Sequence, residues 1–179
     1  MKRLTGFLLV VTGLVWVVAL TAHAAAADTP TLGDKVVAYC KAHLDEKVGN
    51  GECAGLAAQA LSAAGARRRA GPDFPHEGDY VWGKQVYLIE SSPAGPKETG
   101  KLSNVRPGDI MQYRDVRFGE KGGFKHHTAV VAEVFPEKGT IKVYQQNVGG
   151  KRFVTEGEPR LNHLAEGWIR IYRPIPEPR

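Results

Sequence analysis

Apolar residues recur at helical spacing in two stretches of the first third of the chain, which predicts two amphipathic helices. The first helix, over about 32–46, follows a Thr31–Asp34 capping box. Its apolar stripe contains Leu32, Val36, Cys40, Leu44 and Val48. The second helix, over about 52–64, carries its own apolar stripe. Because Gly-Asn-Gly at 49–51 separates them, we expect the two helices to form a hairpin.

The second half of the chain contains short apolar and alternating runs separated by turn residues, which is typical of antiparallel strands. We expect a short strand at 85–89 and longer strands at 110–114, 127–135, 140–147 and 167–173. Residues 66–107 are otherwise rich in Gly, Pro and charge and are predicted mostly as a long ordered loop. Helices followed by strands predict an α+β domain, with the helices packed on one side of an antiparallel β-sheet.

Residues 1–27 have the pattern of a secretory signal peptide. Lys2 and Arg3 precede an uncharged apolar run over 7–20, and small residues follow at 22–24. An uncleaved membrane anchor is the alternative, which the threonines in this segment weaken. We therefore expect a single domain over 28–179 that is exported to the periplasm or secreted and has no membrane span after cleavage.

The composition is that of one ordinary globular domain, with 179 residues, 42% hydrophobic and 24% charged, and a formal net charge of +5. The dense basic run Arg67–Arg69 follows a predicted helix, where the helix dipole favours cations, so no nucleic-acid partner is expected. Two cysteines are too few for a disulfide framework, and no Cys/His cluster offers four ligands to zinc. We expect neither a metal nor an organic cofactor.

Cys53 lies at the start of the second predicted helix, where catalysis and packing are both possible roles. If Asn50 caps this helix, Cys53 is its third residue, where N–H groups and the helix dipole favour a thiolate and can bind an oxyanion. Taken alone, packing is the better explanation, because free cysteines are usually buried. Cys40 lies in mid-helix on the apolar stripe and is assigned to packing. We expect the two thiols to stay unpaired.

His127 is the candidate base for Cys53, because it begins a predicted strand after the glycine-rich, charged loop 117–125. A solvated or structural histidine is the alternative for an isolated residue. The loop, and the segment near Tyr80 and Trp82, are candidate walls of a substrate cleft.

The strands on either side of 136–139 form a predicted hairpin, in which paired residue numbers sum to about 275. His127 then lies opposite Asn147 or its neighbour. Asn147, or Gln145 one step diagonal, could accept a hydrogen bond from the imidazole and orient it. Capping of the sheet end is the alternative role for these amides. A nucleophile, a base and an orienting amide together indicate a triad.

Four segments resemble the papain-like cysteine amidases and peptidases of the bacterial envelope, most of all CHAP domains, to which NlpC-type enzymes are related. The segments are Gly49–Leu56, Arg106–Ile110, His127–Val131 and Val143–Asn147. The resemblance implies a papain-like, NlpC-type fold with Cys53 as nucleophile, His127 as base, and Gln145 or Asn147 as the third member. Gln145 occupies a position where CHAP enzymes often have Glu.

From this resemblance we expect an exported cysteine amidase or endopeptidase that hydrolyses amide bonds in peptidoglycan peptides or another envelope polymer. A thiol acyltransferase, or an effector peptidase with another substrate, would carry the same triad. A secreted binding module that keeps the scaffold without turnover is the other alternative, and it predicts a buried, unreactive Cys53. The oligomeric state is open, with a monomer expected.

Overall fold

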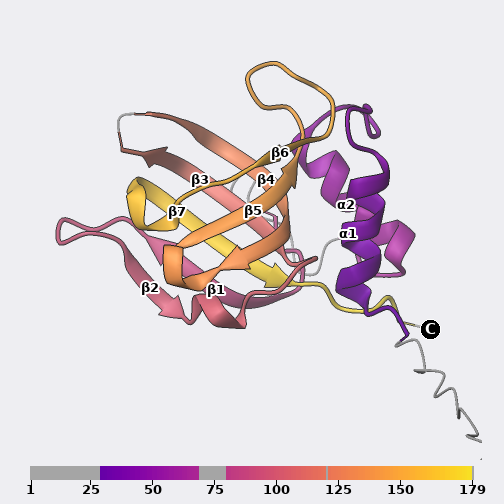
Figure 1. Cartoon of the computed structure of the whole chain (residues 1–179), viewed down its shortest axis with the longest axis horizontal. Coiled ribbons are helices and arrows are strands. Elements are labelled where there is room, and N and C mark those ends of the chain that lie inside the picture. Colours follow the sequence, from indigo (N-terminus) through magenta and orange to yellow (C-terminus); the bar gives the residue numbers. More distant parts are fainter. Residues whose placement is uncertain (1–28, 69–79, 120, 179) are drawn as a thin grey trace, which may run out of the picture.

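In the part of the chain that the structure describes, two α-helices are followed by seven strands (Figure 1). The computed structural model describes residues 29–68, 80–119 and 121–178. Residues 1–27, where the sequence predicts a signal peptide, lie outside the described residues. The elements are α1 (Leu32–Ala42), α2 (Cys53–Ala64), β1 (Lys84–Glu90), β2 (Lys97–Gly100), β3 (Ile110–Phe118), β4 (Lys121–Phe135), β5 (Thr140–Gln145), β6 (Thr155–Gly157) and β7 (Leu164–Arg173). Short 3-10 helices cover Leu102–Asn104, Pro136–Lys138 and Leu161–His163.

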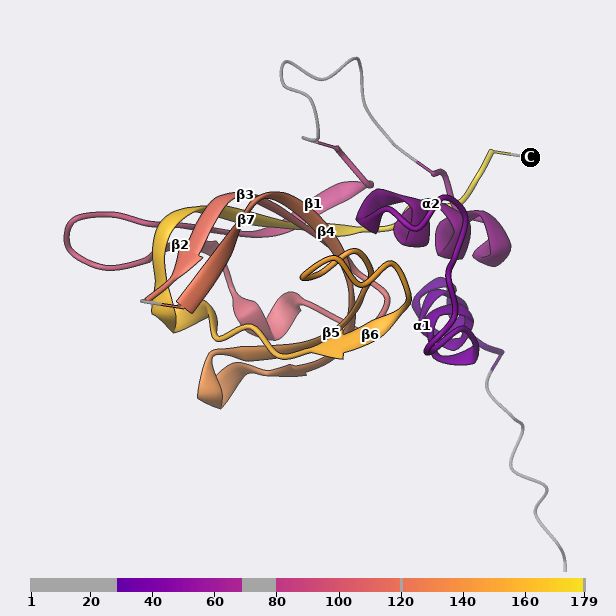
Figure 2. The same cartoon turned by 90° about the horizontal axis from the view of Figure 1, so that it is seen from above.

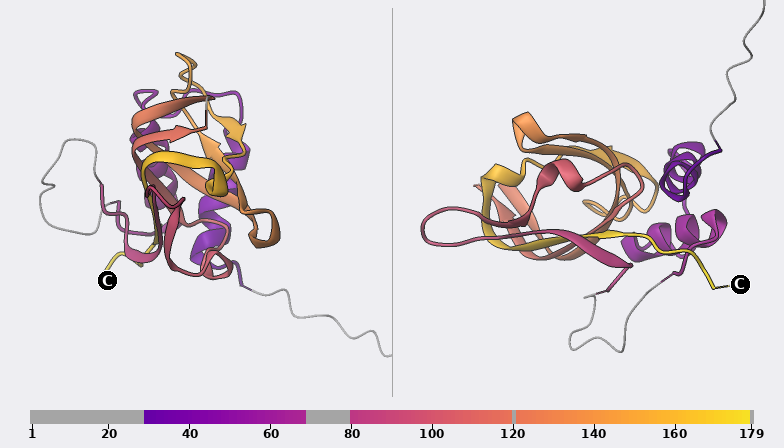
Figure 3. Two further views of the ribbon diagram at one scale, coloured as in Figure 1. Left: turned by 90° about the vertical axis from the view of Figure 1, so that its left-hand side faces the viewer. Right: turned by 90° about the horizontal axis from the view of Figure 1, so that it is seen from below.

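The described strands form one antiparallel sheet in the order β2-β1-β7-β3-β4-β5-β6. The sheet curls so strongly that β5 and β6 lie across from β1 and β7 (Figure 2). The helices α1 and α2 lie together at one side of the sheet, and both contact β4 (Figure 3). The predicted α+β class, with helices packed on an antiparallel sheet, is confirmed.

The helix α1 begins where the sequence predicts it and ends earlier. Thr31 and Asp34 form the predicted capping box, in which each side chain accepts a hydrogen bond from the backbone N–H of the other residue. The helix ends at Ala42 because the following chain turns toward the sheet, where Leu44 forms a parallel bridge with Val154. The apolar stripe beyond Ala42 therefore belongs to this connection and not to the helix.

Two apolar cores lie on opposite faces of the sheet, because successive residues of a strand point to opposite sides. The core between helices and sheet includes Val36, Cys40, Leu56, Leu61, Trp82, Ile110 and Val130. The core inside the curl includes Tyr87, Ile89, Met111, Ala129, Ile141, Val143, Ile169 and Ile171. On β4, His127 shares the inner face of Ala129, and Thr128 shares the helix-side face of Val130. The site described below is built across both faces of this strand.

The strands β3 and β4 pair with each other on both sides of residue 120, within the segment 117–125 that the sequence predicts as a loop. Arg117 pairs with Gly123, and Val116 pairs with Phe124. A Cβ on Gly123 would lie 1.8 Å from the carbonyl oxygen of Val116, so glycine here permits a close approach of two strands. The loop prediction is wrong because this glycine and its charged neighbours belong to paired strands. The short strands β2 and β6 also escaped prediction.

The Pro-Gly-Asp turn that leads into β3 lies directly against the start of α1. A Cβ on Gly108 would lie 2.4 Å from Cα of Gly33, and Gly108 has a φ of +85°. The buried carboxylate of Asp109 accepts hydrogen bonds from the side chain of Arg173 and from the N–H of Arg106. These contacts fix the turn between the first helix and the sheet.

Replacing Gly108 by alanine should lower the free energy of unfolding by about 2 kcal/mol or more, because the methyl group meets backbone atoms and the left-handed φ is strained for alanine. Urea unfolding followed by circular dichroism measures this loss. Gly122→Ala is the matched control, since nothing lies within 4 Å of its added Cβ. Equal stability of the two variants would contradict the backbone contact.

Candidate active site

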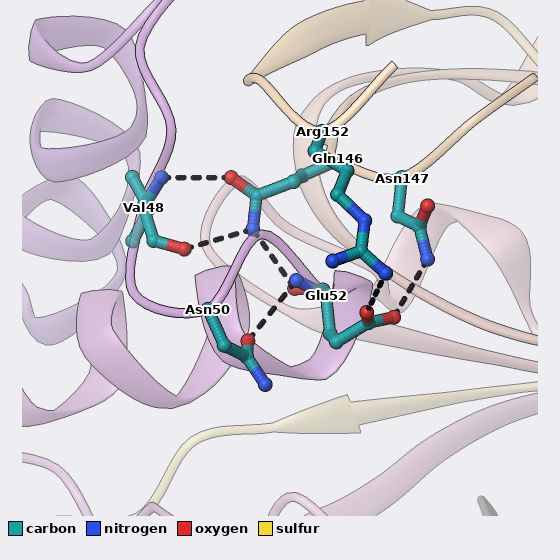
Figure 4. A network of polar contacts seen from close by, with 6 residues as sticks. All are labelled: Val48, Asn50, Glu52, Gln146, Asn147 and Arg152. Atoms are coloured by element: carbon teal, nitrogen blue, oxygen red, sulfur yellow. Dashed lines mark hydrogen bonds and ion pairs between the residues drawn. The ribbon is translucent and has the colours of Figure 1, made fainter. Parts of the chain in front are cut away.

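Cys53 is the first residue of α2, which spans almost the whole predicted range. Glu52 is the N-cap residue and forms no side-chain cap. The predicted cap, Asn50, instead accepts a hydrogen bond from the N–H of Glu52 at 3.0 Å (Figure 4). The thiol therefore occupies the first helical position and not the third, beside N–H groups that a helix start leaves without an intrahelical partner.

The sulfur of Cys53 meets backbone N–H groups from both the helix and the sheet. Hydrogen bonding to the N–H groups of Thr128, Ala54 and Cys53 itself favours the thiolate. By solvent exposure Cys53 is half-buried, and this partial burial opposes the thiolate and is the largest effect; the nearby carboxylate of Glu52 adds to it, so the pKa of Cys53 is raised. The expected lowering of the thiol pKa is wrong for the free protein, because the cost of burying a thiolate exceeds what the helix start provides.

His127 is only 2% exposed and lies on β4. Its ring stacks on Phe124 with the centroids 4.3 Å apart, and Nε2 lies 3.1 Å from Oε1 of Gln145. Because an amide oxygen only accepts hydrogen bonds, Nε2 is the nitrogen that carries the proton of the neutral ring. Burial lowers the pKa of His127 to about 4, although the bond to Gln145 acts in the opposite direction. The imidazole is therefore neutral at neutral pH.

The hairpin of β4 and β5 has the register that the sequence predicts to within one residue. Paired residue numbers sum to 275 near the turn and to 274 at Ala129 and Gln145, where the pairing ends. Gln145 is thus the diagonal neighbour of His127. Asn147 has left the strand with a φ of +63°, and its Nδ2 donates to Oε2 of Glu52 at 2.6 Å. Of the two candidate amides, Gln145 meets the imidazole and Asn147 meets the residue that precedes the nucleophile.

Cys53 lies where the pairing between β4 and β5 ends. The last pair is Ala129 with Gln145, so the edge of β4 that faces β5 is unpaired at Thr128, and the N–H of Thr128 is hydrogen-bonded to the thiol there. Thr128 directly follows His127, so the sulfur lies against the backbone of the strand that carries the imidazole. The structure thus brings Cys53, His127 and Gln145 together at one end of the hairpin.

Gln146 is a site residue that the sequence analysis missed. Its side chain is fully buried, Oε1 accepts from the N–H of Val48 at 2.9 Å, and Nε2 donates to the carbonyls of Val48 (3.1 Å) and Glu52 (2.9 Å) (Figure 4). A signal was present in the alternation of β5, which places Gln146 on the helix-side face of Tyr144. A buried amide on such a face requires hydrogen-bonding partners.

The carboxylate of Glu52 is fixed through both oxygens. Oε1 lies 2.6 Å from Nη2 of Arg152, and Oε2 accepts from Nδ2 of Asn147 at 2.6 Å (Figure 4). The side chain of Glu52 is 40% exposed, so solvent screens part of its charge. The loop that follows β5 is thereby tied to the start of α2.

Trp82 is buried in the core between helices and sheet, so its predicted place in a cleft wall is wrong. Its Nε1 donates to Oε1 of Gln112 at 3.0 Å, and the same oxygen accepts from the hydroxyl of Thr128 at 2.9 Å. Tyr80 is half-buried and contacts Trp82 edge-on. These residues support the strand segment against which the thiol lies.

No group of three or more His, Cys, Asp or Glu side chains that could bind a metal occurs within 29–68, 80–119 and 121–178. No helix in the described part of the chain has the length and apolar character needed to cross a membrane. Cys40 and Cys53 are both free thiols. Burial raises the pKa of Cys40 to about 12, which agrees with a packing role.

A thiol at a helix start, an imidazole on the adjacent strand and an amide bonded to that imidazole form the arrangement expected of a cysteine proteinase fold. The sequence profile of the AIM3/BBC1 cysteine proteinase-fold domain matches residues 20–178, and the chain belongs to this family. The predicted papain-like scaffold is confirmed at the level of this fold.

Sequence and structure comparisons give further similarities. The chain is 29% identical over 160 residues to altered inheritance of mitochondria protein 3 of the yeast Debaryomyces hansenii, a match over 84% of this chain and 16% of that protein. The chain thus spans a small part of the length of this relative. The crystal structure of Ly7917 has a TM-score of 0.45 and 20% identity, covering 79% of this chain and 62% of Ly7917. Ly7917 with the hydrolyzing product of MDP has a TM-score of 0.46 and 20% identity, covering 80% and 63%.

The expectation of an exported peptidoglycan amidase is wrong. The chain belongs to the AIM3/BBC1 cysteine proteinase-fold family, and its relative from a yeast is named altered inheritance of mitochondria protein 3, whereas peptidoglycan is a polymer of the bacterial envelope. The predicted signal peptide and the periplasmic or secreted location are overturned by the same relationship. The error has a chemical reason, because a Cys-His pair specifies the kind of bond that can react and not the polymer that contains it.

Proposed function

We propose that this domain is a cysteine-dependent amidohydrolase or peptidase. Cys53 is the nucleophile, His127 is the general base and acid, and Gln145 orients the imidazole. The observation that carries the proposal is the 3.1 Å contact between Nε2 of His127 and Oε1 of Gln145 on the strand beside the Cys53 thiol. The resemblance of the segments around Cys53 and His127 to CHAP enzymes supports the same assignment.

The two reacting groups start in their neutral forms. The pKa of Cys53 is raised and the pKa of His127 is lowered to about 4, both chiefly by burial, so at neutral pH the thiol and the imidazole are both uncharged. Since Nε2 is bonded to Gln145, Nδ1 is the nitrogen that takes the thiol proton. Proton transfer therefore accompanies the attack of sulfur on the substrate carbonyl.

The remaining steps need only water as a second reactant. As the bond from sulfur to carbon forms, the carbonyl electrons move to oxygen, and N–H groups at the start of α2 stabilise the oxyanion. The imidazolium of His127 then protonates the leaving amine as the C–N bond breaks. Water, deprotonated by the same imidazole, hydrolyses the thioester and restores Cys53. The substrate class that fits these steps is a peptide or protein amide.

Purified protein should hydrolyse fluorescein-labelled casein or members of a fluorogenic peptide-amide library. The Cys53→Ser substitution should lower the rate of hydrolysis by about 10³-fold or more, because the hydroxyl is a poor nucleophile beside a neutral imidazole. Fluorescence release measures both rates. Cys40→Ala is the matched control, since Cys40 is packed in the core between helices and sheet and takes no part in the proposed chemistry, and it should retain activity per folded molecule.

Hydrolysis that is unchanged by Cys53→Ser would remove Cys53 from the mechanism. Alkylation by iodoacetamide, located by peptide mass mapping, gives a second criterion. A wild-type protein that cleaves nothing and whose Cys53 is no more reactive than Cys40 would contradict the proposal, and would identify the domain as a non-catalytic scaffold.

A further inference from the structure

We infer that Gln146 is a positioning residue that fixes the nucleophile relative to its base, an inference that rests on the proposed function. Gln145 meets His127 from one face of β5, and the next residue, Gln146, reaches from the other face to the chain that precedes Cys53. Two consecutive residues therefore bind the imidazole of His127 and the backbone of the residue that directly precedes Cys53. The placement of the thiol relative to the imidazole then depends on this end of β5.

Every polar atom of the Gln146 amide is engaged. The oxygen accepts from the N–H of Val48, and the nitrogen donates to the carbonyls of Val48 and Glu52 (Figure 4). The side chain has no exposed surface, so water cannot replace these bonds without local opening. The amide thus joins the two ends of the connection that runs from Val48 to Glu52.

This connection is short and contains two glycines. Gly49 and Gly51 have left-handed φ values of +56° and +83°, which glycine reaches easily but which do not select one conformation. Its internal bonds are local, from the N–H of Gly51 to the carbonyl of Val48 at 3.0 Å and from the N–H of Glu52 to Asn50. Asn147 and Arg152 hold the Glu52 side chain from outside, and Gln146 binds the backbone at both ends of the connection.

Gln146 acts on the nucleophile through the carbonyl of Glu52. This oxygen accepts the first bonds of α2, from the N–H of Gly55 at 2.9 Å and of Leu56 at 3.4 Å, and it also accepts from Nε2 of Gln146. Cys53 follows Glu52 directly. Without Gln146, the start of α2 can shift away from β4, and the sulfur can leave the N–H of Thr128.

A residue that only stabilised the fold would change the free energy of unfolding and leave the folded molecules as reactive as before. A positioning residue changes the reactivity of Cys53 in the folded molecules themselves. The pH profile of Cys53 alkylation separates these two roles, because it is measured on folded protein and needs no substrate.

The test compares Gln146→Met, which keeps an unbranched side chain of similar size without hydrogen bonds, with the wild-type protein. Iodoacetamide alkylation of Cys53 should slow by about 10- to 100-fold at neutral pH, with kcat reduced and KM little changed. Gln146→Asn retains an amide that is one methylene shorter and should give an intermediate rate. If Gln146→Met fails to fold, Gln146→Asn decides the question.

Arg173→Ala is the matched control. Arg173 also forms three hydrogen bonds, to both carboxylate oxygens of Asp109 and to the carbonyl of Asn104, away from the candidate site. The Arg173→Ala substitution should lower the free energy of unfolding and leave the pH profile of Cys53 alkylation unchanged.

Alkylation and hydrolysis that stay at wild-type values in both Gln146 variants would overturn the inference and leave the proposed function standing. A protein that hydrolyses no amide, but whose Cys53 alkylation still depends on Gln146, would overturn the proposed function and leave the positioning role standing. Equal slowing in Arg173→Ala and Gln146→Met would show a general loss of structure and would also overturn the inference.

Discussion

Substitution of His127 by alanine should reduce kcat/KM for amide hydrolysis by about 10³-fold, because a proton acceptor for the thiol and a donor for the leaving amine are lost together. The neutral starting state makes this loss large, since the pKa of Cys53 is raised and little thiolate is present without a base. Initial rates with the peptide amide that the wild type cleaves best measure the effect, and alkylation of Cys53 at neutral pH should slow in parallel.

Two neighbouring substitutions make this expectation specific. His126→Ala removes an exposed imidazole from the adjacent position of β4 and should change the rate no more than a few-fold. Gln145→Ala leaves the imidazole in place but removes the hydrogen bond to its Nε2. Its kcat/KM should lie between those of His126→Ala and His127→Ala. Activity in His127→Ala equal to that of His126→Ala would remove His127 from the mechanism.

Acid should destabilise the fold through the same histidine. The folded protein keeps the His127 ring neutral down to its pKa of about 4, whereas the unfolded chain protonates it near the ordinary value of 6.5. Between these values the unfolded state binds more protons, so stability falls as the pH falls, by about 3 kcal/mol in all for this shift. Urea unfolding at a series of pH values from 7 to about 4 measures the slope.

The variant His127→Gln removes the titration and should flatten the dependence of unfolding free energy on pH over this interval. His163→Gln is the matched control, because His163 is exposed, and it should keep the wild-type slope. A His127→Gln protein with the same slope as the wild type would contradict the burial of a neutral imidazole. The absolute stability of His127→Gln does not enter this comparison.

Local patterns were sufficient to predict the elements that carry the candidate site. The apolar stripe before Gly65 located α2, and the alternation on either side of 136–139 located the β4 and β5 hairpin with its register. Local patterns failed where distant contacts decide the structure. The helix α1 stops at Ala42 because the chain bridges to Val154, and Gly123 lies in a strand because the opposite backbone comes close.

The sequence was sufficient to predict the candidate reacting residues, but not the residues that hold them in place. Register arithmetic reduced the partners of His127 to Gln145 and Asn147, and the contact with Gln145 follows from the point where β5 ends. The alternation of β5 places Gln146 on a buried face, but its role was missed because its partners, the backbone groups of Val48 and Glu52, cannot be identified from a side-chain pattern. The sign of the shift in the Cys53 pKa was missed because burial is a property of the packed fold.

The contacts that support the nucleophile join segments far apart in the chain, and this separation orders their formation during folding. Val48 and Gln146 are 98 positions apart, and Glu52 and Arg152 are 100 positions apart. Closing such large loops is entropically costly, so these contacts form late, whereas α2 itself needs only local ones. On the ribosome, Cys53 emerges long before His127 and Gln146. A nascent or truncated chain therefore lacks the contacts that place Cys53 in the candidate site until the last third of the sequence has been made.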